Sequence, residues 1–486
     1  MPDIRYVCLS DMHLGAQNSL LTELTPNNKS SDTSKPSPVL IALVDCLRSL
    51  IGQNEDQTKK PTLILAGDIL ELALTTDNLA AMAFERFVEL ILPPAEADRL
   101  FSDILYIPGN HDHHLWETAR ETQYVRYLQT QKQGPGSELE IPYHATSMFG
   151  PAEKNFDPAK ASVPSFFLNG IVQRYKHLAN VEIGTLYPNL ALLTEDHRRC
   201  AIFTHGHFAE SMYLLMSTMR GLMFPKAEKP ELTWDFEAEN FAWIDFFWST
   251  MGRSGAVGSD VEIIYDKLQS ETQLRLLTDN LAAGLSNRPG RSSWKNWIER
   301  RLLKKVFNLV LFAAKNAERT QTDDYLTDDA KKGLTAYVEG PVLKQIKIER
   351  NGNIPPNVAV IFGHTHKPFQ DQYQFDGYEP GVNVYNTGGW VIDSLDRHEK
   401  VGGAVVLADE NLDLTSLRMF NEAGDAAAYS VSVQTATRTE DARNPFHDRI
   451  VGLVDATKNP WKIFSEITAT EIPRRVENLK SKIAQW

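Results

Sequence analysis

Short runs of apolar residues, each ending abruptly in polar residues, recur along the chain. In the clearest case, residues 104–107 predict a buried strand that stops at the Pro-Gly pair 108–109. An amide, an imidazole and a carboxylate follow at once, in Asn110, His111 and Asp112. Similar runs predict strands at 4–9, 61–66, 181–184, 190–193, 200–204, 358–362 and 382–385, and a closing hairpin at 403–408 and 412–417.

Helical spacing of apolar residues, and the polar stretches between such segments, predict the remaining elements. Residues 16–38 are rich in Asn, Ser, Thr, Lys and Pro and predict a mobile loop, and the Ala-, Thr- and Ser-rich residues 421–446 predict a loose segment. Residues 134–164 are irregular and form either a substrate-side loop or a disordered insert. Helices are predicted at 39–51, 79–92, 124–131 and 473–483, the last with Pro473 in its first turn.

The pattern changes between residues 208 and 350, where long helical patterns replace the alternation of strands and turns. At 486 residues the chain exceeds one ordinary domain. We therefore expect a core domain that is interrupted by a helical insertion. The predicted divisions are 1–207 for the N-terminal half of the core, 208–350 for an inserted cap or lid, 351–420 for the C-terminal half, and 421–486 for the loose segment and C-terminal helix.

Composition narrows the class of protein. The chain is 42% hydrophobic and 23% charged, which is typical of a soluble globular protein. Its formal net charge of −13 argues against a large nucleic-acid footprint. Cys8 and Cys200 lie in apolar strand patterns and are expected to be reduced core residues. Because the chain shows neither a signal-like start nor an apolar stretch of about 18 residues, we expect a cytoplasmic protein.

Metal-type ligands follow five of the predicted strands. The carboxyl ends of parallel strands gather at one edge of a sheet, so these side chains are expected to meet there. Apart from His111, the set supplies oxygen and nitrogen donors without a thiolate, enough for two cations if one carboxylate bridges them. Such donors suit Mn, Fe, Zn or Co better than Mg or Ca. The candidate ligands are Asp11, His13, Asp68, Asn110, His205, His364 and His366.

Five motifs in this order resemble the calcineurin-like metallophosphoesterases. The resemblance covers roughly residues 1–208 and 355–420, and every signature position is filled. It implies an α/β fold, the αββα two-sheet sandwich of that family. The motifs are Asp11-Met12-His13, Gly67-Asp68-Ile69-Leu70-Glu71, Gly109-Asn110-His111-Asp112, His205-Gly206 and Gly363-His364-Thr365-His366.

The resemblance also implies a role for each motif residue. A dinuclear metal centre would carry a bridging hydroxide that attacks phosphorus, with His111 protonating the leaving oxygen and Glu71 orienting His111. Asp112 is expected to brace the turn, and His113 and His207 to have core or surface roles. One metal would be held by Asp11, His13, Asp68 and His366, and the other by Asp68, Asn110, His205 and His364.

The expected function is a metal-dependent hydrolase acting on a phosphodiester or pyrophosphate. Three alternatives remain: a lipid-linked pyrophosphatase similar to those acting on UDP-diacylglucosamine, a DNA repair-type nuclease, and a non-catalytic scaffold. The acidic chain fits the nuclease less well.

The insertion is rich in Met at 208–224 and in aromatic residues at 241–248. A basic amphipathic helix with its apolar face at 298–313, flanked by Trp294 and Trp297, indicates either helix-packing core or peripheral membrane contact through 208–316.

Overall fold

The protein is a mixed α/β structure built on two sheets. The computed structural model describes residues 2–131, 138–149, 162–250, 324–423, 430–437 and 443–484. The larger sheet has the order β15-β14-β13-β1-β4-β5-β7-β6, and the smaller has the order β11-β12-β10-β9-β8. Larger-sheet strands are β1 (Tyr6–Leu9), β4 (Thr62–Ala66), β5 (Asp103–Ile107), β6 (Val163–Pro164), β7 (Ile183–Thr185), β13 (Gly402–Ala408), β14 (Leu414–Asn421) and β15 (Ser432–Gln434). Smaller-sheet strands are β8 (Asn189–Leu193), β9 (Arg199–Thr204), β10 (Asn357–Phe362), β11 (Phe369–Tyr373) and β12 (Val382–Asn386).

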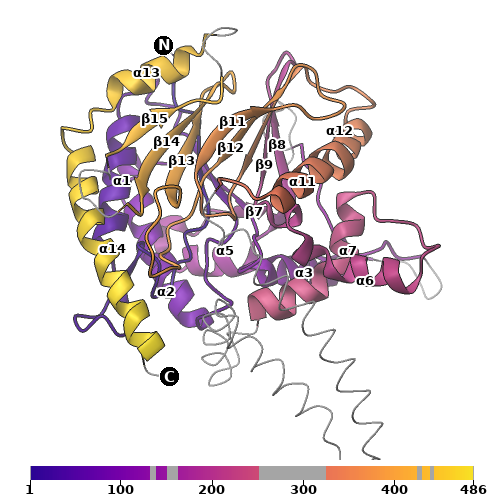
Figure 1. Cartoon of the computed structure of the whole chain (residues 1–486), viewed down its shortest axis with the longest axis horizontal. Helices are drawn as coiled ribbons and strands as arrows, with labels where there is room; N and C mark the ends of the chain where they lie inside the picture. The colour runs from indigo at the N-terminus through magenta and orange to yellow at the C-terminus, as the bar shows by residue number, and fades with distance from the viewer. Residues whose placement is uncertain are drawn as a thin grey trace, which may run out of the picture.

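The two sheets pack face to face, and helices cover their outer faces. Ile64 and Leu105 of the larger sheet share one apolar cluster with Phe203 and Ile361 of the smaller sheet. A second cluster joins the outer face of the larger sheet to α1 (Pro38–Ile51), α2 (Asp77–Ile91), α13 (Pro445–Leu453) and α14 (Trp461–Ala484). A third joins the smaller sheet to α3 (His113–Thr130), α7 (Thr233–Ile244), α11 (Asp328–Tyr337) and α12 (Leu343–Glu349). Figure 1 shows α1 and α14 on one side of the paired sheets and α11 and α12 on the other.

Parallel pairing brings the strand ends together. In the larger sheet β4 pairs in parallel with both β1 and β5, and in the smaller sheet β10 pairs in parallel with both β9 and β12. Backbone hydrogen bonds then join the strand ends: Gly363 N donates to His205 O (3.0 Å) within the smaller sheet, and Trp390 N donates to Asp11 O (3.0 Å) between the two sheets. The loops that follow five strands therefore meet between the sheets.

The predicted strands and hairpin are all present within a few residues, and the first two predicted helices correspond to α1 and α2. Three local predictions were incomplete. The supposed mobile loop at 16–38 contains an antiparallel pair, β2 (Thr22–Leu24) with β3 (Ser31–Pro36). The helix expected at 124–131 is the end of α3, which already begins at His113. Strand β11 was not predicted because its residues 370–372 are polar.

The C-terminal part differs most from the prediction. Helix α14 spans Trp461–Ala484, so Pro473 lies in its interior and the prediction of a proline in the first turn was wrong. The helix continues through Pro473 because Phe464, Ile472 and Val476 are buried against the core on both sides of it. The supposedly loose segment 421–446 is also partly regular, since β15 pairs with β14 and α13 begins at Pro445.

Within its described residues, the predicted insertion is helical. It comprises α6 (Leu215–Met223), α7, α11, α12, the 3-10 turns η3 (His207–Ala209) and η4 (Ser211–Leu214), and the π-helical turns η5 (Asp245–Thr250) and η8 (Val338–Val342). The basic amphipathic helix, Trp294 and Trp297 lie outside the described residues, as do 134–137 and 150–161 of the irregular segment. Among described helices, none has the length and hydropathy needed to cross a membrane. Cys8, Cys46 and Cys200 are buried free thiols, as expected for Cys8 and Cys200.

Three further short helices lie in the described part of the chain. They are η1 (Glu96–Asp98), α5 (Phe166–Val172) and η2 (Lys176–Leu178).

Candidate metal centre

Three of the five strand-end loops, those after β1, β4 and β10, carry unusual backbone conformations at the candidate ligands. Positive φ angles occur at Asp11 (49°), His13 (45°), Asp68 (51°), His364 (68°) and His366 (58°). Left-handed φ is uncommon for residues other than glycine, and its cost must be offset by the surrounding structure. Backbone strain thus occurs at five of the seven candidate ligands.

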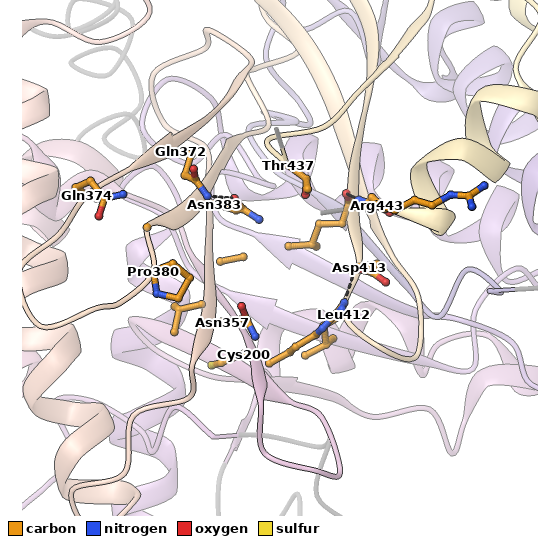
Figure 2. A pocket seen from close by; sticks show the side chains of 16 residues that line it. Cys200, Asn357, Gln372, Gln374, Pro380, Asn383, Leu412, Asp413, Thr437 and Arg443 are labelled. Atoms are coloured by element: carbon orange, nitrogen blue, oxygen red, sulfur yellow. Dashed lines mark hydrogen bonds and ion pairs between the residues drawn. The ribbon is translucent and has the colours of Figure 1, made fainter. Parts of the chain in front are cut away.

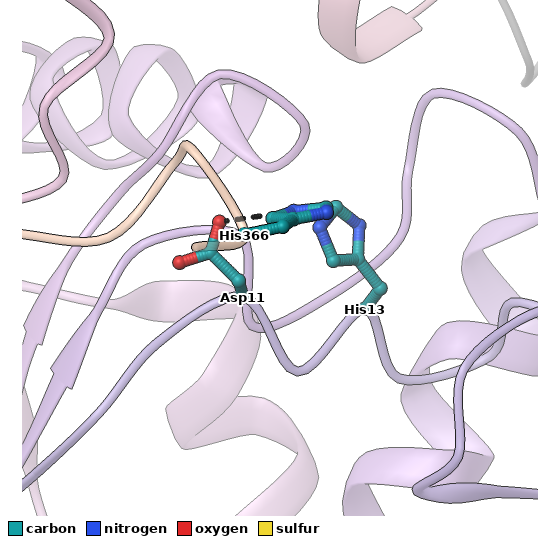
Figure 3. Close-up of side chains that lie close together, drawn as sticks. All are labelled: Asp11, His13 and His366. Atoms are coloured by element: carbon teal, nitrogen blue, oxygen red, sulfur yellow. Dashed lines mark ion pairs between the residues drawn. The ribbon is translucent and has the colours of Figure 1, made fainter. Parts of the chain in front are cut away.

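The first predicted donor set is brought together. Ligand atoms of Asp11, His13 and His366 all lie within 4.8 Å of one another. His366 Nε2 is 3.4 Å from Asp11 Oδ1, and His13 Nε2 is 3.7 Å from Asp68 Oδ2. Figure 3 shows the Asp11 carboxylate pointing toward the His366 ring, with the His13 ring beside it.

The second predicted set converges on a single atom. His205 Nε2 lies 3.0 Å from Asn110 Oδ1, 3.2 Å from His364 Nδ1 and 3.3 Å from Asp68 Oδ2. Asp68 Oδ2 therefore approaches histidines of both sets, His13 and His205. The geometry agrees with a bridging carboxylate.

The donor spacing fits cation binding. Ligand atoms bonded at about 2.0–2.2 Å to one cation lie roughly 3.0–3.6 Å apart, close to the distances within both sets. Among the described residues, neither His13 Nε2 nor His366 Nε2 makes a hydrogen bond, although both atoms are buried. A buried polar atom without a partner is costly unless something else satisfies it. One divalent cation held by the first set would satisfy both nitrogens.

Each candidate imidazole ligand is oriented through its other ring nitrogen, as metal-bound histidines commonly are. His205 Nδ1 lies 3.2 Å from the Ala66 carbonyl oxygen. The other three face carboxylates: His13 Nδ1 is 2.8 Å from Glu71 Oε2, His366 Nδ1 is 2.8 Å from Asp393 Oδ2, and His364 Nε2 is 2.6 Å from Glu210 Oε1.

Sequence reasoning missed Asp393 and Glu210. Glu210 lies five residues beyond the His205 strand end but contacts the His364 loop. Asp393 lies beyond the Gly-Gly-Trp segment 388–390 and contacts the His366 loop. Neither residue occupies a motif position, so no local signal marked it.

Glycines let the loops approach one another closely. A Cβ on Gly67 would stand 2.3 Å from His205 Nδ1, and one on Gly363 would stand 2.0 Å from Asp11 Oδ2. At Gly109 the obstructing atom is Asp68 Oδ1, at 2.3 Å. Non-bonded atoms do not approach a Cβ atom this closely. These positions therefore require glycine for the ligands to converge.

Opposite charges keep the buried carboxylates ionised. Burial alone would raise the pKa of Asp11, but His366 and His205 outweigh it and lower the pKa to about 2. For Glu71, burial is likewise outweighed by His111 and His13, and its pKa is lowered to about 2. The pKa of His205 is raised to about 9 by Asp68 and Asp11 despite burial. Anionic carboxylates at neutral pH are the form that a cation requires.

His111 lies against the donor sets and is held by core residues. Its Nδ1 is 2.9 Å from Glu71 Oε1, and its backbone N–H donates to Asp68 Oδ1 at 2.7 Å. Glu71 therefore orients both His111 and His13, of which only the first was predicted. Asp112 accepts from Gly109 N at 2.6 Å and from Ile69 N at 2.8 Å, so it braces the turn as expected.

His113 and His207 are both buried and belong to a separate polar network. His113 Nε2 is 2.7 Å from Glu237 Oε1, and the Tyr187 hydroxyl donates to Glu237 Oε2 at 2.9 Å. His207 Nε2 lies 3.2 Å from the same hydroxyl. These histidines therefore have core roles.

His113 also forms a possible donor group with Glu117 and Glu237. However, the Arg120 guanidinium donates to both carboxylate oxygens of Glu117. A guanidinium here already supplies the positive charge that a metal ion would bring. The group is better described as an ion network between α3 and α7.

We predict that the His113–Glu237 pair makes stability depend on pH. Burial would lower the pKa of His113, but Glu237 and Asp245 outweigh it and raise the pKa from 6.5 to about 10. A raised folded-state pKa stabilises the protein fully below about pH 6.5, and this contribution is lost as pH rises through about 10. The melting temperature of His113→Gln should therefore lie furthest below that of wild type near pH 6 and approach it by pH 10.

Thermal unfolding across this pH range measures the effect. In a Glu237→Gln background, the same His113 substitution should produce a difference that varies much less with pH. A wild-type difference that stays constant from pH 6 to pH 10 would contradict the prediction.

A cavity of about 520 Å³ lies at the opposite end of the sheets. Arg199 and Asn357, the first residues of β9 and β10, line it together with Asn383, Asp413 and Arg443 (Figure 2). It includes none of the candidate ligands. The donor sets are therefore separate from this cavity.

Comparison with known proteins leaves the family open. No protein-family model matches the chain, and no curated protein is significantly similar to it in sequence. Assignment of function therefore depends on the motifs and on the geometry of the site.

Proposed function

We propose that the chain is a calcineurin-like metallophosphoesterase, with the αββα fold of that family, that uses two divalent cations to hydrolyse a phosphodiester or pyrophosphate. The observation that carries the proposal is the shared position of Asp68, whose carboxylate approaches both donor sets while its other oxygen holds the backbone of His111. The donor chemistry favours Mn, Fe, Zn or Co.

In this proposal, one set of donors is Asp11, His13, Asp68 and His366, and the other is Asp68, Asn110, His205 and His364. When bound, the cations would offset phosphate charge and activate water as the nucleophile.

The chain's own contribution is positioning and proton transfer. Glu71 accepts a hydrogen bond from His111 Nδ1 and fixes the ring beside the donor sets. His111 then gives a proton to the leaving oxygen. Glu71, Asp393 and Glu210 hold three imidazole ligands in orientation. His111 is only 4% exposed, so water has little access to the proton donor.

A substrate panel tests the proposal. Protein supplied with Mn²⁺, Zn²⁺ or Co²⁺ is assayed on p-nitrophenyl phosphate, bis-p-nitrophenyl phosphate, nucleoside diphosphate sugars and single-stranded DNA. Hydrolysis of the diester or the pyrophosphate, lost on chelation and restored by metal, is the expected result. Cleavage of DNA alone would support the nuclease. Bound metal without hydrolysis of any substrate would support the scaffold and reject the proposal.

A second candidate, a lipid-linked pyrophosphatase, is favoured by exposed apolar side chains on the insertion. Met223, Phe224 and Phe246 are 61%, 61% and 62% exposed. Met216, on the same helix as Met223, is 40% exposed. An insertion that contributes Glu210 to the donor region and carries apolar groups outside could hold the acyl part of a lipid substrate at a membrane surface.

Vesicle binding tests this second candidate. Wild type should sediment with anionic phosphatidylglycerol vesicles, and changing Met223, Phe224 and Phe246 together to Ser should abolish sedimentation. A matched control changes Ile141 and Val451, exposed apolar residues outside the insertion, to Ser and should retain binding. Absence of binding by wild type would reject the membrane contact but leave the phosphoesterase proposal intact.

A further inference from the structure

Helix α3 begins two residues after the candidate proton donor His111, and its N-cap residue makes no side-chain capping hydrogen bond. The N-cap residue is Asp112. Its carboxylate instead accepts backbone N–H groups of Gly109, Asp68 and Ile69. The first N–H groups of a helix have no partner within the helix. Because the Asp112 side chain is used in the turn around Gly109, the first backbone N–H groups of α3 need an acceptor from another part of the chain.

Ser249 supplies that partner from the insertion. The His114 N–H donates to Ser249 Oγ at 2.9 Å, and the Ser249 hydroxyl donates to the His111 carbonyl oxygen at 3.2 Å. Ser249 is fully buried in the π-helical turn η5. One side chain thus caps α3 and holds the peptide of the candidate proton donor.

Two carboxylates hold the same part of the insertion against the same part of the core. Glu237 of α7 pairs with His113, and Asp245 of η5 lies 3.0 Å from His114 Nδ1. With Ser249, the insertion therefore contacts His111, His113 and His114, three of four consecutive positions. A π-helical turn is rare and often occurs at functional sites.

We propose that Ser249 is a positioning residue for His111, through which the insertion sets the orientation of the proton donor. The inference rests on the proposed phosphoesterase function. Two further anchors of His111, Asp68 at its backbone N–H and Glu71 at its ring, come from the core. Ser249 fixes the carbonyl side of the same residue. Proton transfer requires close alignment, so a small displacement reduces the rate without changing the metal donors.

Ser249→Ala tests the role, and Ser217→Ala is the matched control. Ser217 also lies in the insertion and accepts a hydrogen bond from Asn240 Nδ2 at 2.8 Å, but it belongs to α6. Ser249→Ala should lower kcat roughly tenfold for substrates with poor leaving groups, the effect of losing one buried hydrogen bond. KM, metal content and turnover of good leaving groups should change by less than twofold. Ser217→Ala should leave all four quantities close to wild type.

Hydrogen exchange gives a readout that does not depend on activity. Peptides covering residues 111–118 should exchange faster in Ser249→Ala than in Ser217→Ala, because the His114 N–H loses its acceptor. If both variants match wild type in exchange and in leaving-group dependence, the inference is overturned. If wild type hydrolyses none of the substrates, the proposed function fails, and the exchange comparison alone then decides whether Ser249 holds this segment.

Discussion

Asp68→Ala is expected to remove both cations and abolish turnover. Asp68 Oδ2 lies 3.3 Å from His205 Nε2 and 3.7 Å from His13 Nε2, so one substitution takes a donor from each set. Altering an outer partner of a metal ligand typically lowers metal affinity about 10- to 100-fold, and loss of a shared ligand should exceed this. Elemental analysis of purified protein should fall from two cations per chain in wild type to nearly none.

Two comparison variants separate ligand loss from damage to the fold. Asp68 Oδ1 also accepts the His111 N–H, so Asp68→Asn removes the charge but can retain this hydrogen bond. Asp103→Ala removes an exposed carboxylate from the other end of the neighbouring strand β5 and should keep both cations. Full occupancy in folded Asp68→Ala would overturn the bridging assignment, and loss of only one cation would show that Asp68 belongs to a single set.

His111→Ala is expected to retain both cations and lose turnover by about 10²- to 10⁴-fold for poor leaving groups, the usual range for general acid catalysis. His111 is not among the proposed ligands: one of its ring nitrogens lies within 4.8 Å of ligand atoms of His13 and Asp68, and its Nδ1 contacts Glu71 Oε1 at 2.9 Å. Good leaving groups depart without a proton, so their rates should fall much less. A series of aryl phosphodiesters with leaving groups of graded pKa measures the difference.

The metal content of His111→Ala must be checked beside its rates, because Glu71 also holds His13. His177→Ala provides a control, since this imidazole contacts the Leu92 carbonyl oxygen away from the site. It should match wild type over the whole substrate series. Equal losses for good and poor leaving groups in His111→Ala would assign His111 an electrostatic or positioning role in place of acid catalysis.

The sequence by itself determined the strands that carry the candidate ligands and the residues at the ends of those strands. Each signal is local: an apolar run forms a buried strand, a glycine permits a tight turn, and a ligand follows within a few residues. Parallel order of such strands was enough to predict that Asp11, Asp68, Asn110, His205 and His364 would converge. The distances within the donor sets agree with this prediction.

Helix boundaries were harder to predict where the buried face of a helix is made of polar side chains, because apolar periodicity is then weak. The start of α3 was missed because residues 113–123 show little apolar periodicity. In the folded protein His113, Glu117 and Arg120 are nevertheless buried, since charged partners satisfy them. Proline normally kinks or ends a helix. Helix α14 nevertheless continues through Pro473, because Phe464 and Ile472 are buried against the core.

Only the tertiary structure decided which groups orient the site. Glu210 faces His364, Asp393 faces His366, and Ser249 lies between His111 and His114. The hydrogen bond from Ser249 to the His111 carbonyl oxygen joins residues that are 138 positions apart in the chain. Sequence periodicity is a local signal, so it cannot reveal a hydrogen bond between residues that are so far apart in the chain. Local patterns therefore identify candidate ligands, whereas packing between the core and the insertion determines how those ligands and the proton donor are held.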